Sequence, residues 1–341
     1  MSAEDIWPPR QRLVGGWLLI VCAFVFAMIM VGGATRLTDS GLSITEWNFM
    51  KHIVPPMSEA AWDREFALYQ RTMEYQTQNN GMSLDEFRGI YWWEWGHRFL
   101  GQALGIVFLL PALYFFLTGR LRGRFRVTLL LFFLGGLQGA IGWWMVTSGL
   151  FDRLDVSPLR LAIHLAMAFL ILAIALWTAL GAFAWPSQRS QAGVWRWAPF
   201  AFLALVFTQV MLGALLAGSD GGRAYADWPT IGGEWIPASA FGLDSFWANF
   251  TEEHATQHLL HRSLGYLVAL AALLLALVGL IRGQGEARWA SGLIGLVALL
   301  QAGLGIMTVL AASPLSLSLL HQAGAAILWM TALIAARAAW R

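Results

Sequence analysis

Apolar residues recur along the chain in eight runs of about 20 residues, each bounded by charged residues or by proline and glycine clusters. A helix rises about 1.5 Å per residue, so a run of this length crosses the hydrocarbon core of a bilayer. We expect helices near 13–34, 91–118, 127–149, 158–184, 197–218, 255–281, 289–311 and 315–337. The pattern therefore predicts an all-α, polytopic membrane protein with eight transmembrane helices.

Composition supports a chain surrounded by membrane lipid. Hydrophobic residues make up 58% of 341 residues and charged residues only 12%, with a mean hydropathy of +0.59. The surface of a soluble domain needs more polar residues than this. Cys22 is the single cysteine, so the sequence offers no intrachain disulfide and no cysteine metal cluster. The net charge of +2, without a basic tail, gives no reason to expect a nucleic-acid partner.

Arginines mark one end of the predicted helices. An even number of spans places both termini on the same side. The arginines expected on that side are Arg10, Arg12, Arg120, Arg122, Arg124, Arg126, Arg189, Arg196, Arg282, Arg288, Arg337 and Arg341. The positive-inside rule makes this side cytoplasmic. The opposite side carries two long loops, about 35–90 and 219–254, and we expect the function to lie there.

The two halves of the chain share short motifs at matching positions of their helices. The matched segments are 97–101 and 261–265, Gln138-xxx-Gly142 and Gln301-xxx-Gly305, Pro158 to His164 and Pro314 to His321, and Val25 to Gly32 and Val206 to Gly213. We infer a duplicated four-helix unit, with an N-terminal half over 1–190 and a C-terminal half over 191–341. Since each unit has an even number of spans, both insert with the same orientation. The expected architecture is two tandem, pseudo-symmetric four-helix bundles.

Four histidines fall in the outer third of the predicted helices, two in each half: His97, His164, His261 and His321. An ionisable side chain inside a membrane is costly unless it faces a partner in the protein interior. Two imidazoles from different helices can bind one haem iron from opposite faces, so each half offers one such pair. A packing role, a binuclear metal site and a proton relay also use buried histidines, but none of these requires matched pairs at equal depth.

The halves differ beside these histidines. Glu94 precedes His97 by three residues and shares its helix face, whereas His258 stands at the corresponding position before His261. A buried carboxylate can transfer a proton or stabilise positive charge at a reacting carbon. We therefore expect chemistry in the first half and a permanent haem that passes electrons in the second. The plainer reading of Glu94 is a carboxylate favoured by a helix N-terminus.

Other polar residues near the histidines have two readings each. Arg98 and Arg262 directly follow a histidine and can bind haem propionates, although arginines at a membrane edge also simply extend to water. His254, His258 and His261 recur at helical spacing and could form a zinc or copper site. We favour this metal site less than the haem pairs.

The glycine-rich segment from Gly32 to Ser43, the motif Glu94-x-x-His97-Arg98 and the three further histidines together resemble the haem A synthases. The resemblance covers essentially the whole chain. It implies an oxidoreductase that converts the C8 methyl group of haem O to a formyl group, giving the haem A of cytochrome oxidases. Residues 35–90 lack the cysteine pair of some members, so the chain is most similar to the cysteine-free class of proteobacteria and mitochondria.

The resemblance also implies roles for single residues. His261 and His321 would be the axial ligands of a resident haem b iron, with Arg262 beside them. His97 and His164 would hold the substrate haem O, with Arg98 and Arg36 as further substrate contacts, and Glu94 would be catalytic. The implied location is the bacterial inner membrane, with both termini cytoplasmic. Candidate partners are an electron donor of unknown identity, haem O synthase, oxidase assembly factors and a second copy of the chain.

Two other functions use the same features. In a di-haem electron-transfer cytochrome both haems would be permanent and nothing would be made. A transporter built from repeats could use the histidines as a proton path. Glu94, which has no acidic counterpart in the second half, favours the enzyme over the cytochrome. A purified protein without haem colour would favour the transporter.

Overall fold

The computed structural model describes residues 9–46, 53–151, 153–183, 196–283 and 285–340. Within these residues the structure is helical and has no β-strand. The long helices are α1 (Pro9–Leu37), α4 (Leu84–Leu117), α5 (Phe125–Phe151), α6 (Pro158–Leu180), α7 (Ala198–Gly218), α9 (His254–Arg282), α10 (Gly285–Leu310) and α11 (Leu315–Trp340). All eight are long and apolar enough to cross a membrane, which confirms the predicted spans.

Helix α4 begins seven residues before the predicted start at 91. Its first turn is a capping box, in which the Ser83 hydroxyl accepts from the Glu86 N–H and the Glu86 carboxylate accepts from the Ser83 N–H. This exchange satisfies two backbone donors that a helix end otherwise leaves free. Hydropathy alone missed these turns because they are amphipathic and precede the apolar run.

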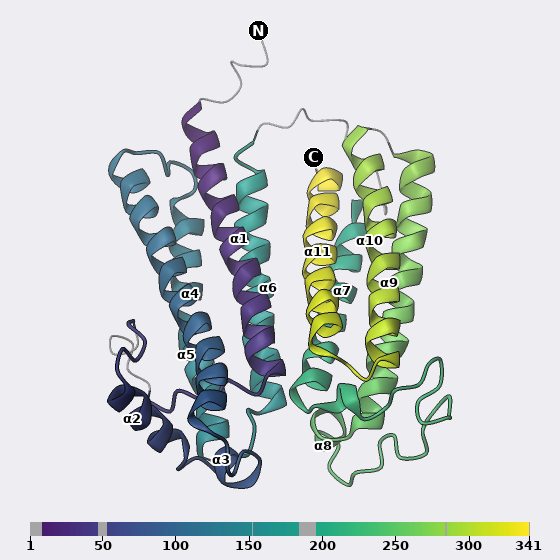
Figure 1. The fold of residues 1–341 in the computed structure, drawn as a ribbon. Helices are drawn as coiled ribbons and strands as arrows, with labels where there is room; N and C mark the ends of the chain where they lie inside the picture. The colour runs from purple at the N-terminus through teal and green to yellow at the C-terminus, as the bar shows by residue number, and fades with distance from the viewer. Residues whose placement is uncertain (1–8, 47–52, 152, 184–195, 284, 341) are drawn as a thin grey trace.

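The long loops lie together at one end of the helices, opposite the N-terminal end of α1 and the C-terminal end of α11 (Figure 1). The first loop contains α2 (Glu59–Tyr69) and α3 (Met73–Thr77), and the second contains η3 (Gly221–Arg223) and α8 (Ala248–Thr251). The first loop has a small aromatic core, in which Trp62 and Tyr69 pack near Phe87 and Tyr91 of α4. The described part of the first loop is therefore a folded cap on α4; which side of the membrane the two loops face stays a prediction.

Four helices form the centre of the molecule. Helix α1 packs on α6 and α7 packs on α11, while α6–α7 and α1–α11 contacts join the two halves (Figure 1). Across this centre the indole N–H of Trp329 donates to the backbone carbonyl of Phe169 at 3.1 Å. The remaining helices stand at the flanks, α4 and α5 on one side and α9 and α10 on the other (Figure 1). The symmetry of the two bundles stays a prediction, and their predicted boundary at 190 lies outside the described residues.

The two flanks are packed differently. Helix α10 packs extensively on both α9 and α11, whereas α4 makes few contacts with α5. In the most apolar 18-residue stretch of α4, and likewise in that of α5, only 6% of the residues are buried. The corresponding shares are 22% in α9 and 28% in α10. The first half is therefore the more open of the two.

Candidate functional site

Each of the four predicted histidines lies against a glycine of a neighbouring helix. The pairs are His97 with Gly32 of α1, His164 with Gly142 of α5, His261 with Gly213 of α7, and His321 with Gly305 of α10. A Cβ atom on any of these glycines would lie 2.9 to 3.0 Å from an imidazole atom. Glycine is therefore required for the ring to approach the neighbouring backbone. These glycines belong to the repeated motifs, but the sequence did not reveal that they support the rings.

The histidine pair of the second half has the spacing that one metal ion needs. The ring centres of His261 and His321 are 6.4 Å apart, and their planes cross at 83°. A metal–nitrogen bond of about 2 Å, plus about 1 Å from nitrogen to ring centre, puts the centres of two opposed ligands about 6 Å apart. The pair thus fits two axial ligands of one haem iron.

Glutamines fix three of the four histidines. The side-chain Nε2 of Gln138, Gln209 and Gln301 donates to the backbone carbonyl of His164, His261 and His321, at 3.1, 3.0 and 2.8 Å respectively. The same nitrogen lies 3.1 to 3.3 Å from a ring nitrogen of its histidine. Each glutamine also has a buried Oε1 atom without a hydrogen-bond partner among the described residues. Each amide nitrogen is therefore placed between the ring and the backbone carbonyl of its histidine.

Glu94 is buried, with 3% of its surface exposed, and is held by the first outer loop. Its Oε2 accepts from the Ser43 hydroxyl at 2.8 Å and from the Ile44 backbone N–H at 2.7 Å. Its Oε1 accepts from Arg98 at 2.5 Å. The segment that carries the resemblance in sequence thus fixes the carboxylate one helical turn before His97. The arrangement can place a negative charge at a defined point.

Arg98 also ties the outer loop to α4. Its guanidinium donates to the carbonyls of Ile44 and Glu46, at 2.8 and 3.2 Å. The sequence predicted Arg98 as a contact of a haem propionate. In the structure its guanidinium binds Glu94 and the first outer loop.

In the second half, Arg262 ties the second outer loop to α9 as Arg98 ties the first loop to α4, with His258 in the place of Glu94. Arg262 donates to the carbonyls of Asp227 and Thr230, at 2.9 and 2.7 Å, and to His258 Nδ1 at 3.0 Å. His258 Nε2 in turn donates to the Gly221 carbonyl at 2.8 Å. Both ring nitrogens of His258 are therefore occupied by protein groups.

The alternative metal site on α9 is not formed. His258 has no lone pair left for an ion, and His254 Nε2 lies 3.0 Å from the Ser219 carbonyl. Among the described residues, His254, His258 and His261 do not bring three ligand atoms together. Helical spacing suggested this site, but the rings of His254 and His258 instead form hydrogen bonds with the second outer loop.

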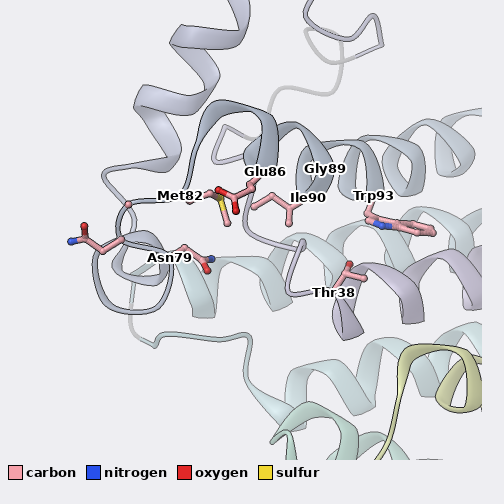
Figure 2. A pocket seen from close by; sticks show the side chains of 9 residues that line it. Thr38, Asn79, Met82, Glu86, Gly89, Ile90 and Trp93 are labelled. Carbon is pink, nitrogen blue, oxygen red and sulfur yellow. The ribbon is translucent and has the colours of Figure 1, made fainter.

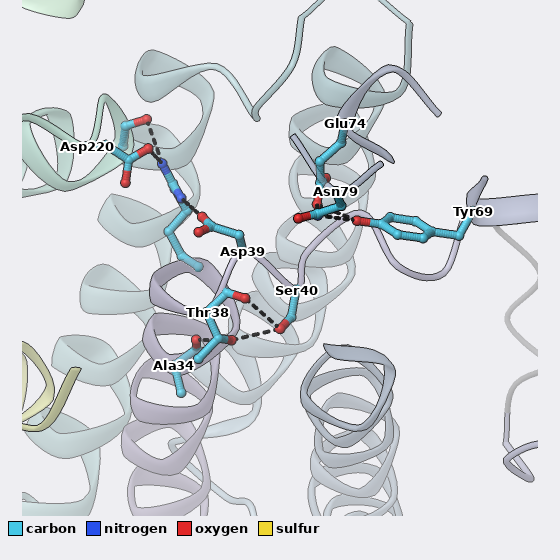
Figure 3. A network of polar contacts seen from close by, with 10 residues as sticks. Ala34, Thr38, Asp39, Ser40, Tyr69, Glu74, Asn79 and Asp220 are labelled. Atoms are coloured by element: carbon cyan, nitrogen blue, oxygen red, sulfur yellow. Dashed lines mark hydrogen bonds and ion pairs between the residues drawn. The ribbon is translucent and has the colours of Figure 1, made fainter. Parts of the chain in front are cut away.

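Arg36 lies where the two halves meet, between the ends of α1 and α7. It donates to Asp39 at 2.8 Å and to Asp220 at 2.6 Å (Figure 3). A carboxylate of Asp155 lies within 4.8 Å of both. Burial and these neighbouring carboxylates raise the pKa of Asp39, against the lowering effect of Arg36. The structure thus gives this predicted substrate contact a role in joining the halves.

A depression of about 630 Å³ opens on the first outer loop. Its lining includes Thr38, Asn79, Glu86, Ile90 and Trp93 (Figure 2). The four histidines do not line it, so it belongs to the loop surface and not to the histidine pairs.

A buried carboxylate lies beside this depression. Tyr69 donates to Glu74 at 2.9 Å, and Asn79 donates to the Tyr69 hydroxyl at 2.7 Å (Figure 3). Burial raises the pKa of Glu74 to about 8. Burial in the first outer loop thus favours the protonated form of this carboxyl group.

Comparison with known proteins identifies the family of the chain. The family model described as "Cytochrome oxidase assembly protein" matches residues 15–333. The chain belongs to this family. It is 48% identical to "Heme A synthase" of Maricaulis maris (strain MCS10) over 338 residues, 97% of each chain. It is 45% identical to "Heme A synthase" of Caulobacter sp. (strain K31), over 95% of each chain. The resemblance inferred from the motifs is confirmed over nearly the whole length, while the roles of single residues stay predictions.

Proposed function

We propose that the chain is a haem A synthase, an oxidoreductase that converts the C8 methyl group of haem O to a formyl group. The observation that carries the proposal is the repeated histidine pair, set against glycines, in a family member 42–48% identical to proteins named "Heme A synthase". Among the described residues, a buried carboxylate one turn before a paired histidine occurs in the first half alone, so we assign the chemistry to that half.

In the second half, His261 and His321 would bind a resident haem b, which supplies electron transfer when bound. The 6.4 Å separation of their rings supports this assignment. Gly213 and Gly305 allow the rings to reach the bundle interior. Arg262 has a buried Nε atom without a partner among the described residues, and this atom is the donor we assign to a propionate.

In the first half, His97 and His164 would hold haem O as substrate. The proposed reaction is two successive hydroxylations of one methyl carbon, each a two-electron oxidation whose oxidising equivalents and oxygen atom come from outside the chain. Loss of one water from the resulting diol then leaves the formyl group. Glu94, fixed by Ser43, Ile44 and Arg98, would stabilise positive charge that develops at this carbon. Arg98 and Arg36 would act mainly by keeping the carboxylate and the outer loop in place.

We further propose that the protein spans the bacterial inner membrane with both termini cytoplasmic. The arginine-rich ends of the predicted spans support this orientation. Haem O synthase, oxidase assembly factors, an electron donor and a second copy of the chain remain candidate partners.

The test is to express the full chain in cells that make haem O but not haem A, and to separate the extracted haems by chromatography. We expect haem A with the natural chain and none with His97→Ala or His164→Ala. A purified chain that holds two haems and makes no haem A would instead identify a di-haem electron-transfer cytochrome. A purified chain that binds no haem would favour a transporter.

A further inference from the structure

One histidine of the four lacks a glutamine. The repeat aligns Met30 and Gly32 of α1 with Met211 and Gly213 of α7, which places Met28 opposite Gln209. The structure supports the alignment. A Cβ on Gly265, one turn after His261, would lie 3.2 Å from Gln209 Nε2, and a Cβ on the matching Gly101 would lie 3.5 Å from Met28 Cε. The two side chains therefore occupy corresponding places in the two halves.

The exchange removes both hydrogen-bonding groups of the amide. Gln209 donates to the His261 carbonyl and lies 3.1 Å from its ring, and its Oε1 remains available as an acceptor. A thioether has no N–H and is only a weak acceptor. Met28 therefore can fill the space against Gly101 but cannot hold the ring of His97 as the amides hold the other three.

We propose that Met28 makes His97 the exchangeable ligand of the first half, while Gln138 keeps His164 in place as the lasting one. This inference rests on the proposed function, because it takes haem O to bind between these two histidines. The releasable ligand is then on α4, one turn from Glu94, and α4 also belongs to the loosely packed flank. The second half has an amide at both ligands, as a cofactor that must be retained requires.

Carbon monoxide tests the proposal, because it binds reduced haem iron only where a protein ligand gives way. The full chain, purified in detergent with haem b and supplied with haem O, is reduced and mixed with carbon monoxide, and the absorbance change is followed in time. We expect the haem O site to react and the haem b site not to react. Met28→Gln should slow the reaction by roughly fivefold, the effect of one added hydrogen bond of about 1 kcal/mol.

Two variants complete the design. Leucine has a volume similar to that of methionine and also lacks an amide. The haem O site of Met28→Leu should therefore react as that of the natural chain does. If Met28 itself bound the iron, Met28→Leu would change the spectrum, and the proposal would be overturned. Gln209→Met should make the haem b site react with carbon monoxide. This second measurement is independent of haem O binding and of the folding of Met28→Gln. A haem b site that stays unreactive in Gln209→Met overturns the proposal.

Failure of the inference can be told from failure of the proposed function. If a variant with alanine at both His97 and His164 still binds haem O in the natural amount, the first half is not the substrate site. If haem O binding depends on these histidines but Met28→Gln reacts as fast as the natural chain, only the role of Met28 is lost.

Discussion

Each half places two imidazoles against glycines of neighbouring helices, yet the contacts around these histidines differ between the halves. In the second half α9 and α10 pack closely, and both histidines contact an amide. In the first half α4 and α5 make few contacts with each other, and one histidine has a methionine where the amide would be. If the proposed haem sites are correct, local packing and one side chain distinguish a site that retains its haem from one that exchanges it.

Arg98 and Arg262 anchor the two outer loops in similar ways. Arg98 and Arg262 both donate to two carbonyls of the nearest outer loop and to the residue one turn earlier. Because His258 completes this anchor without a charge, the loop does not need an acid to be held. The carboxylate of Glu94 therefore has a reason to be present other than loop anchoring.

The largest effect is expected from Glu94→Gln. This variant keeps the hydrogen-bond acceptor for Ser43 or Ile44 but loses the charge. We expect haem A formation to fall roughly a hundredfold while haem O binding remains. The measurement is the haem A to haem O ratio in extracts, with haem content as the control. Haem A made at the natural rate would remove the proposed role.

The next largest effects are expected from replacing one histidine of each pair, and these effects should differ between the halves. His321→Ala is expected to lower the haem b content at least about tenfold, because iron would keep one of two protein ligands. His164→Ala should leave the haem b spectrum unchanged and lower haem O binding instead. Optical spectra of both purified variants give the answer. Equal loss of haem b from both would show that the halves do not bind their haems independently.

The supporting glycines give a smaller effect. Gly213→Ala places a Cβ atom 2.9 Å from His261, so we expect a loss of about 1–3 kcal/mol in haem b retention from overpacking. Gly16→Ala in α1 is the control, since nothing lies within 4 Å of its added Cβ and alanine favours a helix. Thermal melts that follow haem b release would compare them. Retention that is equal in the two variants would mean that the ring moves without cost.

Sequence reasoning reached the eight spans, the four histidines and Glu94 because each leaves a local signal, namely an apolar run, an intramembrane ionisable residue or a break in a repeat. It could not reach contacts made between distant segments. The bonds from Ser43 and Ile44 to Glu94 cross the first outer loop, and the Arg36 ion pair with Asp220 joins the two halves. Gln209 was missed because its partner, His261, lies on another helix and only packing brings them together.

The smallest effect concerns the two outer loops, which should respond to pH in opposite directions. Glu74 in the first loop has a pKa raised to about 8 by burial, so its contribution to loop stability is full below about pH 4.5 and is lost as pH rises through 8. Asp227 in the second loop accepts from the backbone N–H groups of Gly233 and Gly232, and its pKa is lowered to about 2. Its contribution is present above about pH 4 and is lost as pH falls towards 2.

Limited proteolysis across this pH range, with an acid-active and an alkali-active protease, would measure loop opening. We expect cleavage within 59–77 to increase between pH 6 and about 9, and Glu74→Gln to abolish that increase because a neutral amide cannot ionise. Cleavage within 224–247 should increase only in acid, and Asp227→Asn should make it frequent at neutral pH, since the amide presents a weaker acceptor to Gly232 and Gly233. First-loop cleavage that rises in acid instead would show that Glu74 is charged in the folded loop, and that its hydrogen bond from Tyr69 outweighs burial.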